Sequence, residues 1–100
     1  MINLEAEYLE KIKKILAKHL DKSAEVFVFG SRITNNFKKY SDLDLAINNG
    51  GTKIESSVIG NLKTDFENSL IPVKVDVVDL SDISEEFKNI ILKKFERLEF

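Results

Sequence analysis

The stretch FGSRITNNFKKYSDLDLAI, residues 29–47, decides the fold of this chain. It begins at the end of an apolar run, turns at Gly30-Ser31 and, after ten intervening residues, reaches Asp42-Leu43-Asp44. Apolar and polar side chains alternate over residues 41–47, which is the pattern of a strand with one buried face. We therefore predict two strands joined by a loop, with the two aspartates about 7 Å apart on one face of the second strand.

The composition favours one compact domain, spanning residues 1–100, because 43% of the residues are hydrophobic and 32% are charged. The net charge of -2 lacks the basic excess expected of a protein that grips long nucleic acid. The absence of cysteine excludes disulfides and thiolate metal sites. No basic-then-apolar leader and no apolar run of membrane-spanning length is present, so we expect a cytoplasmic protein.

The rest of the chain alternates between helical and strand patterns. Apolar residues recur at helical spacing over residues 2–20 and 56–70, and Ser81 or Ser84 can cap a third helix. Strand patterns cover residues 24–29 and 73–79, in addition to residues 41–47, and a short helix and a closing strand are expected at residues 32–35 and 95–100. This order predicts an α/β (α+β) domain with a small mixed sheet flanked by helices.

Carboxylates interrupt two of the predicted strands. Asp42 and Asp44 repel each other unless a cation or solvent lies between them, and Asp76 joins them if the two strands are neighbours. Three carboxylates can hold two magnesium ions beside a phosphate. The alternative is that these aspartates simply face water on the open side of a sheet. Asp79 and Asp82 are left out of the site, since a strand end and a turn explain them.

The Gly30-Ser31 turn is the second candidate element of the site. Glycine lets the backbone approach a ligand closely, and the start of a helix presents free N–H groups to an anion. Ser31 adds a hydroxyl donor that can contact the phosphates of a nucleotide. The alternative is that Ser31 is only a helix N-cap and Gly30 only a turn residue.

Taken together, these motifs resemble the minimal nucleotidyltransferase domain of the DNA polymerase β-like superfamily. The resemblance rests on Gly30-Ser31, the ten-residue spacing, Asp42-Leu43-Asp44 and the later strand IPVKVDVVDL with Asp76, and it covers nearly the whole chain. It implies that Gly30 and Ser31 contact the nucleotide triphosphate. It further implies that Asp42 and Asp44 bind metal, and that Asp76 ligates metal and assists deprotonation of the acceptor hydroxyl.

The resemblance leaves two points open in the loop that follows the turn. Arg32 matches the arginine that often follows the Gly-Ser pair, and its role is either a phosphate contact or a surface salt bridge. Many relatives have a glycine where this chain has Asn35 or Asn36. Asparagine is the non-glycine residue best suited to left-handed backbone, so the loop can keep its shape, but whether the site still turns over is left open.

The small stand-alone members of the superfamily are often encoded beside a HEPN-domain partner and act as antitoxins. The resemblance thus implies a Mg²⁺-dependent transfer of AMP from ATP to a hydroxyl, plausibly a tyrosine of a HEPN toxin. One alternative is an antitoxin that acts by binding alone, and another is a transferase for a small molecule. His19 is expected at the surface near a helix end, and Tyr40 either stacks on a base or packs at the rim.

Overall fold

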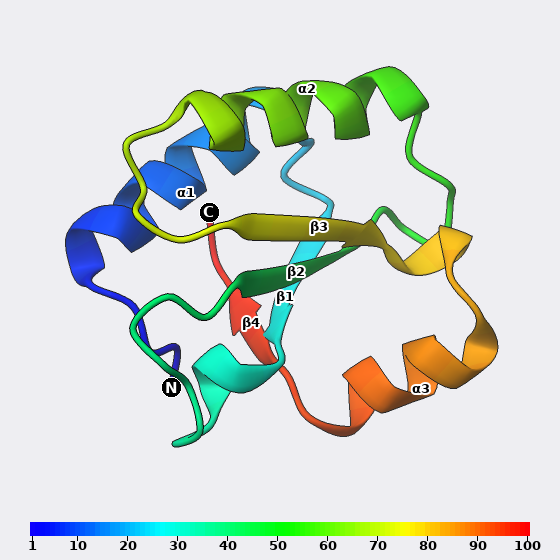
Figure 1. Ribbon diagram of the computed structural model, residues 1–100. Helices are drawn as coiled ribbons and strands as arrows, with labels where there is room; N and C mark the ends of the chain where they lie inside the picture. The colour runs from blue at the N-terminus through cyan, green and yellow to red at the C-terminus, as the bar shows by residue number, and fades with distance from the viewer.

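The computed structural model describes residues 1–100 and contains four strands and three α-helices (Figure 1). Two short 3-10 helices, η1 and η2, follow β1 and β3. In chain order the elements are α1 (Ala6–His19), β1 (Glu25–Phe29), η1 (Ser31–Ile33), β2 (Leu43–Asn48), α2 (Ser56–Asn68), β3 (Val75–Asp79), η2 (Leu80–Asp82), α3 (Glu85–Lys93) and β4 (Glu96–Leu98). The predicted class, a small mixed sheet flanked by helices, is confirmed. No helix combines the length and apolarity needed to cross a membrane.

The sheet has the order β3-β2-β1-β4, so β3 and β4 are its two edges. β2 runs antiparallel to β1 and parallel to β3, and α2 makes the crossover that the parallel pair requires. The backbone N–H of Leu43 donates to Lys74 O at 2.9 Å. This hydrogen bond belongs to a register that sets Asp44 directly opposite Asp76.

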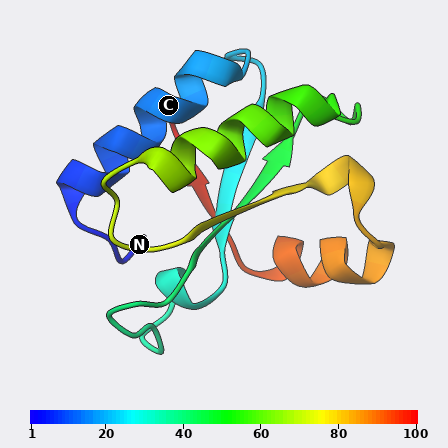
Figure 2. The ribbon, with the colours of Figure 1, turned by 45° about the horizontal axis from the view of Figure 1, so that its top comes forward.

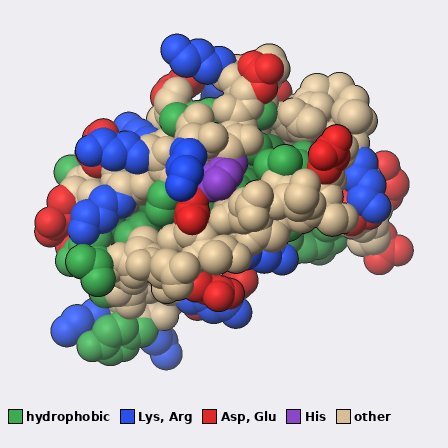
Figure 3. All heavy atoms as spheres, turned by 90° about the horizontal axis from the view of Figure 1, so that it is seen from above, with side chains coloured by type: hydrophobic (Ala, Val, Ile, Leu, Met, Phe, Trp, Pro, Cys, Tyr) green, Lys and Arg blue, Asp and Glu red, His purple; other side chains and the backbone are tan.

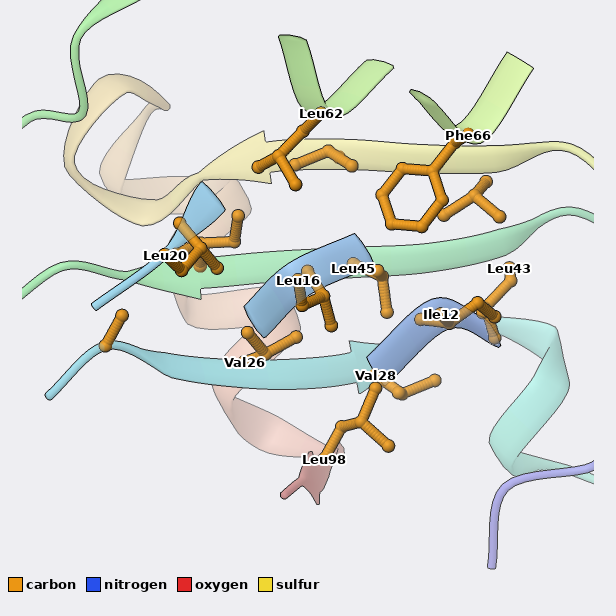
Figure 4. Close-up of a cluster of buried hydrophobic side chains, with 14 of the residues drawn as sticks. Ile12, Leu16, Leu20, Val26, Val28, Leu43, Leu45, Leu62, Phe66 and Leu98 are labelled. Atoms are coloured by element: carbon orange, nitrogen blue, oxygen red, sulfur yellow. The ribbon is translucent and has the colours of Figure 1, made fainter. Parts of the chain in front are cut away.

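Helices α1 and α2 cover one face of the sheet, and α3 lies against the other (Figures 1 and 2). Figure 4 shows the larger core, in which Leu16 of α1 and Leu62 of α2 meet Leu43 and Leu45 of β2. All four side chains are fully buried. Truncating any one of them to alanine is expected to cost about 2–5 kcal/mol of the free energy of unfolding. The apolar alternation along β2 thus fixes which face of that strand turns away from the core.

The opposite face of the sheet carries a smaller cluster, composed of Phe27, Ala46, Leu80 and Ile91. Phe29 and Phe87 extend it, with ring centroids 5.9 Å apart in an edge-to-face arrangement. Since α3 covers only part of this face, the starts of β2 and β3 are left without a helix over them (Figures 1 and 2). That uncovered end is where Asp44 of β2 and Asp76 of β3 lie.

Several element boundaries differ from the sequence prediction, and two of them, the starts of α1 and β2, bear on the site. α1 begins at Ala6 rather than at residue 2, because the preceding segment is tied to the Gly-Ser turn: Asn3 N donates to Arg32 O at 2.7 Å, and Asn3 Nδ2 donates to Thr34 O at 2.8 Å. β2 begins at Leu43, so Asp42 stands just before the strand instead of within it. The cap of α3 is Ser84, whose hydroxyl accepts from Phe87 N at 3.1 Å.

Candidate active site

Three carboxylates meet at the uncovered end of the sheet. Asp44 of β2 and Asp76 of β3 are partners in the parallel register, and Asp42 joins them from the residue before β2. One carboxylate oxygen from each residue lies within 4.8 Å of the other two. Asp42 is exposed and the other two are partly buried. The structure therefore brings together all three carboxylates that the sequence singled out.

Burial and mutual repulsion perturb the central carboxylate. Desolvation, followed by the negative charges of Asp76 and Asp42, raises the pKa of Asp44 to about 6, and the ammonium of Lys74 opposes this rise. Lys74 Nζ lies 3.5 Å from Asp76 Oδ1, so the cluster holds one cation against three carboxyl groups. Additional positive charge would lower the electrostatic free energy of this cluster.

The donor set fits a hard divalent cation. It consists of carboxylate oxygens alone, which suit magnesium or manganese better than metals that favour sulfur or nitrogen ligands. A cation between the three groups would also relieve the repulsion that raises the pKa of Asp44. Asp42, Asp44 and Asp76 are accordingly the residues that would hold such an ion.

The Gly-Ser turn lies directly against this cluster. Gly30 has φ +82 and ψ -156, a conformation that side chains disfavour, and a Cβ placed on it would stand 2.5 Å from Asp44 Oδ2. Gly30, not Ser31, is the N-cap of η1, and no side chain caps the turn. The cap role considered for Ser31 is therefore wrong. Ser31 begins a helical turn, and the first N–H groups of such a turn have no hydrogen-bond partner within it.

Arg32 follows this turn, and the structure excludes one of the two roles considered for it from the sequence. Its side chain is buried, with 4% exposed, so it is not part of a surface salt bridge. Nε donates to Ser41 O at 3.1 Å, Nη1 to Asn3 O at 2.9 Å and Nη2 to Lys39 O at 2.9 Å. The guanidinium also stacks on Phe37, 5.3 Å from its ring centroid. Arg32 thus ties η1 to the segment that leads into Asp42, and the phosphate contact expected from the family resemblance stays a prediction.

The sequence could not disclose that role, because the three carbonyl acceptors are distributed over the N-terminal segment and the loop. The loop also differs from expectation at Asn35 and Asn36, since neither has a positive φ. Thr34 shapes it instead: its hydroxyl donates to Ser31 O at 2.9 Å and accepts from Asn36 N at 3.0 Å. The turn is closed by a side chain, so left-handed backbone is not required.

Three other residues weighed from the sequence lie outside the cluster. Asp79 is buried and accepts from Ile54 N at 2.7 Å and from Ser81 N at 2.9 Å, which agrees with its exclusion from the site. His19, purple in Figure 3, is not a free surface residue: its ring is largely buried, and Nε2 lies 2.5 Å from Asp65 Oδ2 of α2. Tyr40 is 72% exposed, with Lys39 over its ring.

Comparisons with known proteins agree with this geometry. The model of the family described as "Polymerase beta, Nucleotidyltransferase" matches residues 10–98. A curated protein of Haemophilus influenzae, named "Probable protein adenylyltransferase MntA", is 37% identical over 94 residues, which make up 94% of this chain and 81% of that protein.

Two solved structures share the fold. A crystal structure of the toxin–antitoxin pair MntA-HpeT, in mutant form, has a TM-score of 0.71 at 21% identity and covers 90% of this chain and 70% of its own. A crystal structure of a toxin–antitoxin with AMP-PNP has a TM-score of 0.74 at 23% identity, over 90% and 71% of the two chains. At these identities the likeness concerns the fold alone.

Proposed function

Because this chain belongs to the polymerase beta nucleotidyltransferase family, we propose that it transfers AMP from ATP to a hydroxyl on a protein partner. The observation that carries the proposal is the contact between Gly30 and the carboxylate of Asp44, within a cluster completed by Asp42 and Asp76. A triphosphate-binding turn and a carboxylate cluster are the two components that a nucleotidyl transfer requires in one place. Magnesium held by the three aspartates would supply charge neutralisation at the phosphoryl group.

Each part of the site has a separate role in the proposed transfer. The N–H groups at the start of η1 and the Ser31 hydroxyl donate to the β- and γ-phosphates of ATP. The acceptor oxygen forms a bond to the α-phosphorus as the bond from that phosphorus to the bridging oxygen of the β-phosphate breaks, and pyrophosphate leaves with the electron pair. The hydroxyl proton passes to a carboxylate of the cluster, for which Asp76 is our assignment. Arg32 holds the loop that presents Asp42.

The proposed acceptor is a tyrosine of a HEPN-domain toxin. Attachment of the adenylyl group would inactivate the toxin, so that the chain acts as the antitoxin. The name of the H. influenzae relative and the fact that the two solved structures are of toxin–antitoxin systems support a protein acceptor of this kind. The exposed position of Asp42 and the partly exposed position of Asp76 support it further, because a protein side chain can reach the cluster from solvent.

Intact-mass spectrometry tests the proposal directly. The chain is incubated with ATP, MgCl₂ and the product of the neighbouring gene, as the proposed toxin, and an adenylyl adduct on that protein is expected. The variant Asp42→Ala/Asp44→Ala should give no adduct although it still binds the toxin. Tight complex formation without any adduct from the natural chain would refute the enzymatic proposal in favour of an antitoxin that acts by binding. An adduct on a small hydroxyl compound, and never on protein, would favour the small-molecule transferase.

A further inference from the structure

A trough runs along the free edge of the sheet, between β3 and α2. β3 is an edge strand, with no strand beside it on the side away from β2, where α2 runs along it (Figures 1 and 2). Two hollows of about 470 and 370 Å³ follow this edge, and Lys63 of α2 contributes to the walls of both. The first hollow includes Asp76 in its wall, so the trough leads into the carboxylate cluster.

The geometry of phosphoryl transfer determines on which side of the carboxylate cluster the acceptor hydroxyl binds. In a phosphoryl transfer the attacking and leaving oxygens lie roughly in line, on opposite sides of the phosphorus. If the leaving pyrophosphate is held by the Gly30-Ser31 turn, the acceptor hydroxyl arrives from the side opposite that turn. Asp44 lies between Gly30 and Asp76, because it contacts the first and pairs with the second. The acceptor side is therefore the Asp76 side, at the edge of β3.

The chemistry of the trough fits a polypeptide. Its first hollow combines apolar walls from Phe66, Ile71 and Pro72 with the charges of Lys63 and Glu67. Leu70, in the same turn after α2, is 84% exposed, although leucine is a residue that folding usually buries. An edge strand presents unpaired backbone N–H and C=O groups, which an extended segment of another chain can satisfy by strand addition.

We propose that the trough binds an extended segment of the protein acceptor, which pairs with β3 and delivers its hydroxyl to Asp76. This inference rests on the proposed function and adds the docking mode. The segment is expected to carry an apolar side chain that covers Leu70 and a carboxylate that meets Lys63, since Lys63 has no ion-pair partner in this chain. Strand addition would supply affinity, and these two side-chain contacts would supply specificity.

The test compares two exposed positions on the acceptor side with two exposed positions away from the site. Leu70→Glu and Lys63→Glu lie on the acceptor side. The matched controls are Leu92→Glu and Lys93→Glu of α3, where Leu92 is 41% exposed and lines a hollow that contains no residue of the site. For each variant, far-UV circular dichroism checks the fold, and adenylylation rates are measured against the concentrations of HEPN toxin and of ATP. Affinity for the toxin without ATP is measured by calorimetric titration.

Leu70→Glu and Lys63→Glu should each raise the KM for the toxin by about tenfold or more and leave the KM for ATP unchanged. The two controls should change neither constant. Equal toxin KM values in all variants, or a rise in the ATP KM alone, would overturn the inference. A chain that dimerises by itself and becomes monomeric on Leu70→Glu would also overturn it, because the occupant would then be a second copy. If the natural chain transfers no AMP, the proposed function fails, and the titration still tests the trough.

Discussion

Gly30 and Asp44 are in direct contact across two strands: a Cβ on Gly30 would stand 2.5 Å from Oδ2 of Asp44. Gly30 ends β1 with φ +82, and Asp44 is the β2 residue paired with Phe29. The antiparallel register thus places the turn that would hold phosphate against the carboxylate that would hold metal. Two requirements, positive φ and absence of a side chain, coincide at one residue.

Replacing Gly30 should lower both the free energy of unfolding and the rate of AMP transfer. Gly30→Ala forces a residue with a Cβ into a backbone conformation that is essentially restricted to glycine, which costs about 1–3 kcal/mol, and it displaces the carboxylate of Asp44. Displacement by about 1 Å at a reacting centre can lower kcat on the order of 100-fold. Urea unfolding and single-turnover transfer would measure the two effects. The control is Gly60→Ala in α2, where a Cβ meets nothing within 4 Å and should stabilise the chain by about 0.5–1 kcal/mol.

Removing the charge of Asp44 should stabilise the metal-free protein. The pKa of Asp44 is about 6 in the folded chain, against 3.8 for the unperturbed carboxyl, because burial and the neighbouring carboxylates disfavour its charge. Between these values the folded state binds the proton that the unfolded state has released, so stability falls as the pH rises and levels off above pH 6. In EDTA at pH 8, Asp44→Asn should therefore be more stable by about 1 kcal/mol, after allowance for solvent screening.

We expect this pH dependence of stability to be visible in chemical denaturation. The free energy of unfolding is measured for Asp44→Asn and for the natural chain from pH 4.5 to pH 8. The two curves should converge towards low pH and separate as the pH rises. Curves that run parallel across the range would mean that Asp44 does not carry the raised pKa. The same variant should lose AMP transfer, so stability and activity would move in opposite directions.

Binding of a divalent cation should offset the loss of stability that the ionised carboxylate of Asp44 causes in the natural chain. At pH 8 Asp44 is ionised, and 10 mM Mg²⁺ bound by the cluster at a Kd of about 1 mM would add about 1.4 kcal/mol to the free energy of unfolding. At pH 5 the rise in melting temperature should be smaller, because Asp44 is mostly protonated there. Differential scanning fluorimetry with Mg²⁺ or Mn²⁺ against EDTA measures the shift. Asp82→Asn, which changes an exposed carboxylate outside the cluster, should respond like the natural chain.

Loss of the buried arginine should loosen the loop that leads into the cluster. Arg32→Ala leaves three backbone carbonyls without their charged donor, and we expect a loss of about 2–4 kcal/mol in the free energy of unfolding. Arg32→Lys keeps the charge but cannot reach three separate acceptors, so it should rescue only part of the loss. Urea unfolding measures both. Arg97→Ala is the matched control, because Arg97 is half exposed and surface ion pairs contribute about 0–1 kcal/mol.

The contact between His19 and Asp65 should make the packing of α1 on α2 sensitive to acid. The hydrogen bond from His19, aided by Lys18, lowers the pKa of Asp65 below its usual value. A depressed carboxyl pKa stabilises the folded state above about pH 4, and this stabilisation is lost as the pH falls through the lowered folded value. Asp65→Asn should therefore reduce stability at pH 7 and leave it unchanged near pH 2, as measured by thermal unfolding. An equal loss at both pH values would contradict the assignment.

The sequence by itself determined the strands, the helices and the identity of the three carboxylates. Alternation along β2 is enough to turn Leu43 and Leu45 into the core and Asp44 away from it, because side chains of a strand alternate between its faces. The spacing from Gly30-Ser31 to Asp42 was a local property too, and it carried the family resemblance.

Only the tertiary structure decided how these parts meet. Strand register depends on hydrogen bonds between distant residues, so the pairing of Asp44 with Asp76 and the contact of Asp44 with Gly30 could not be read from spacing. The same holds for Arg32, whose acceptors lie on segments that fold next to it only in three dimensions. The free edge of β3 follows from strand order, a global property that local propensities do not encode.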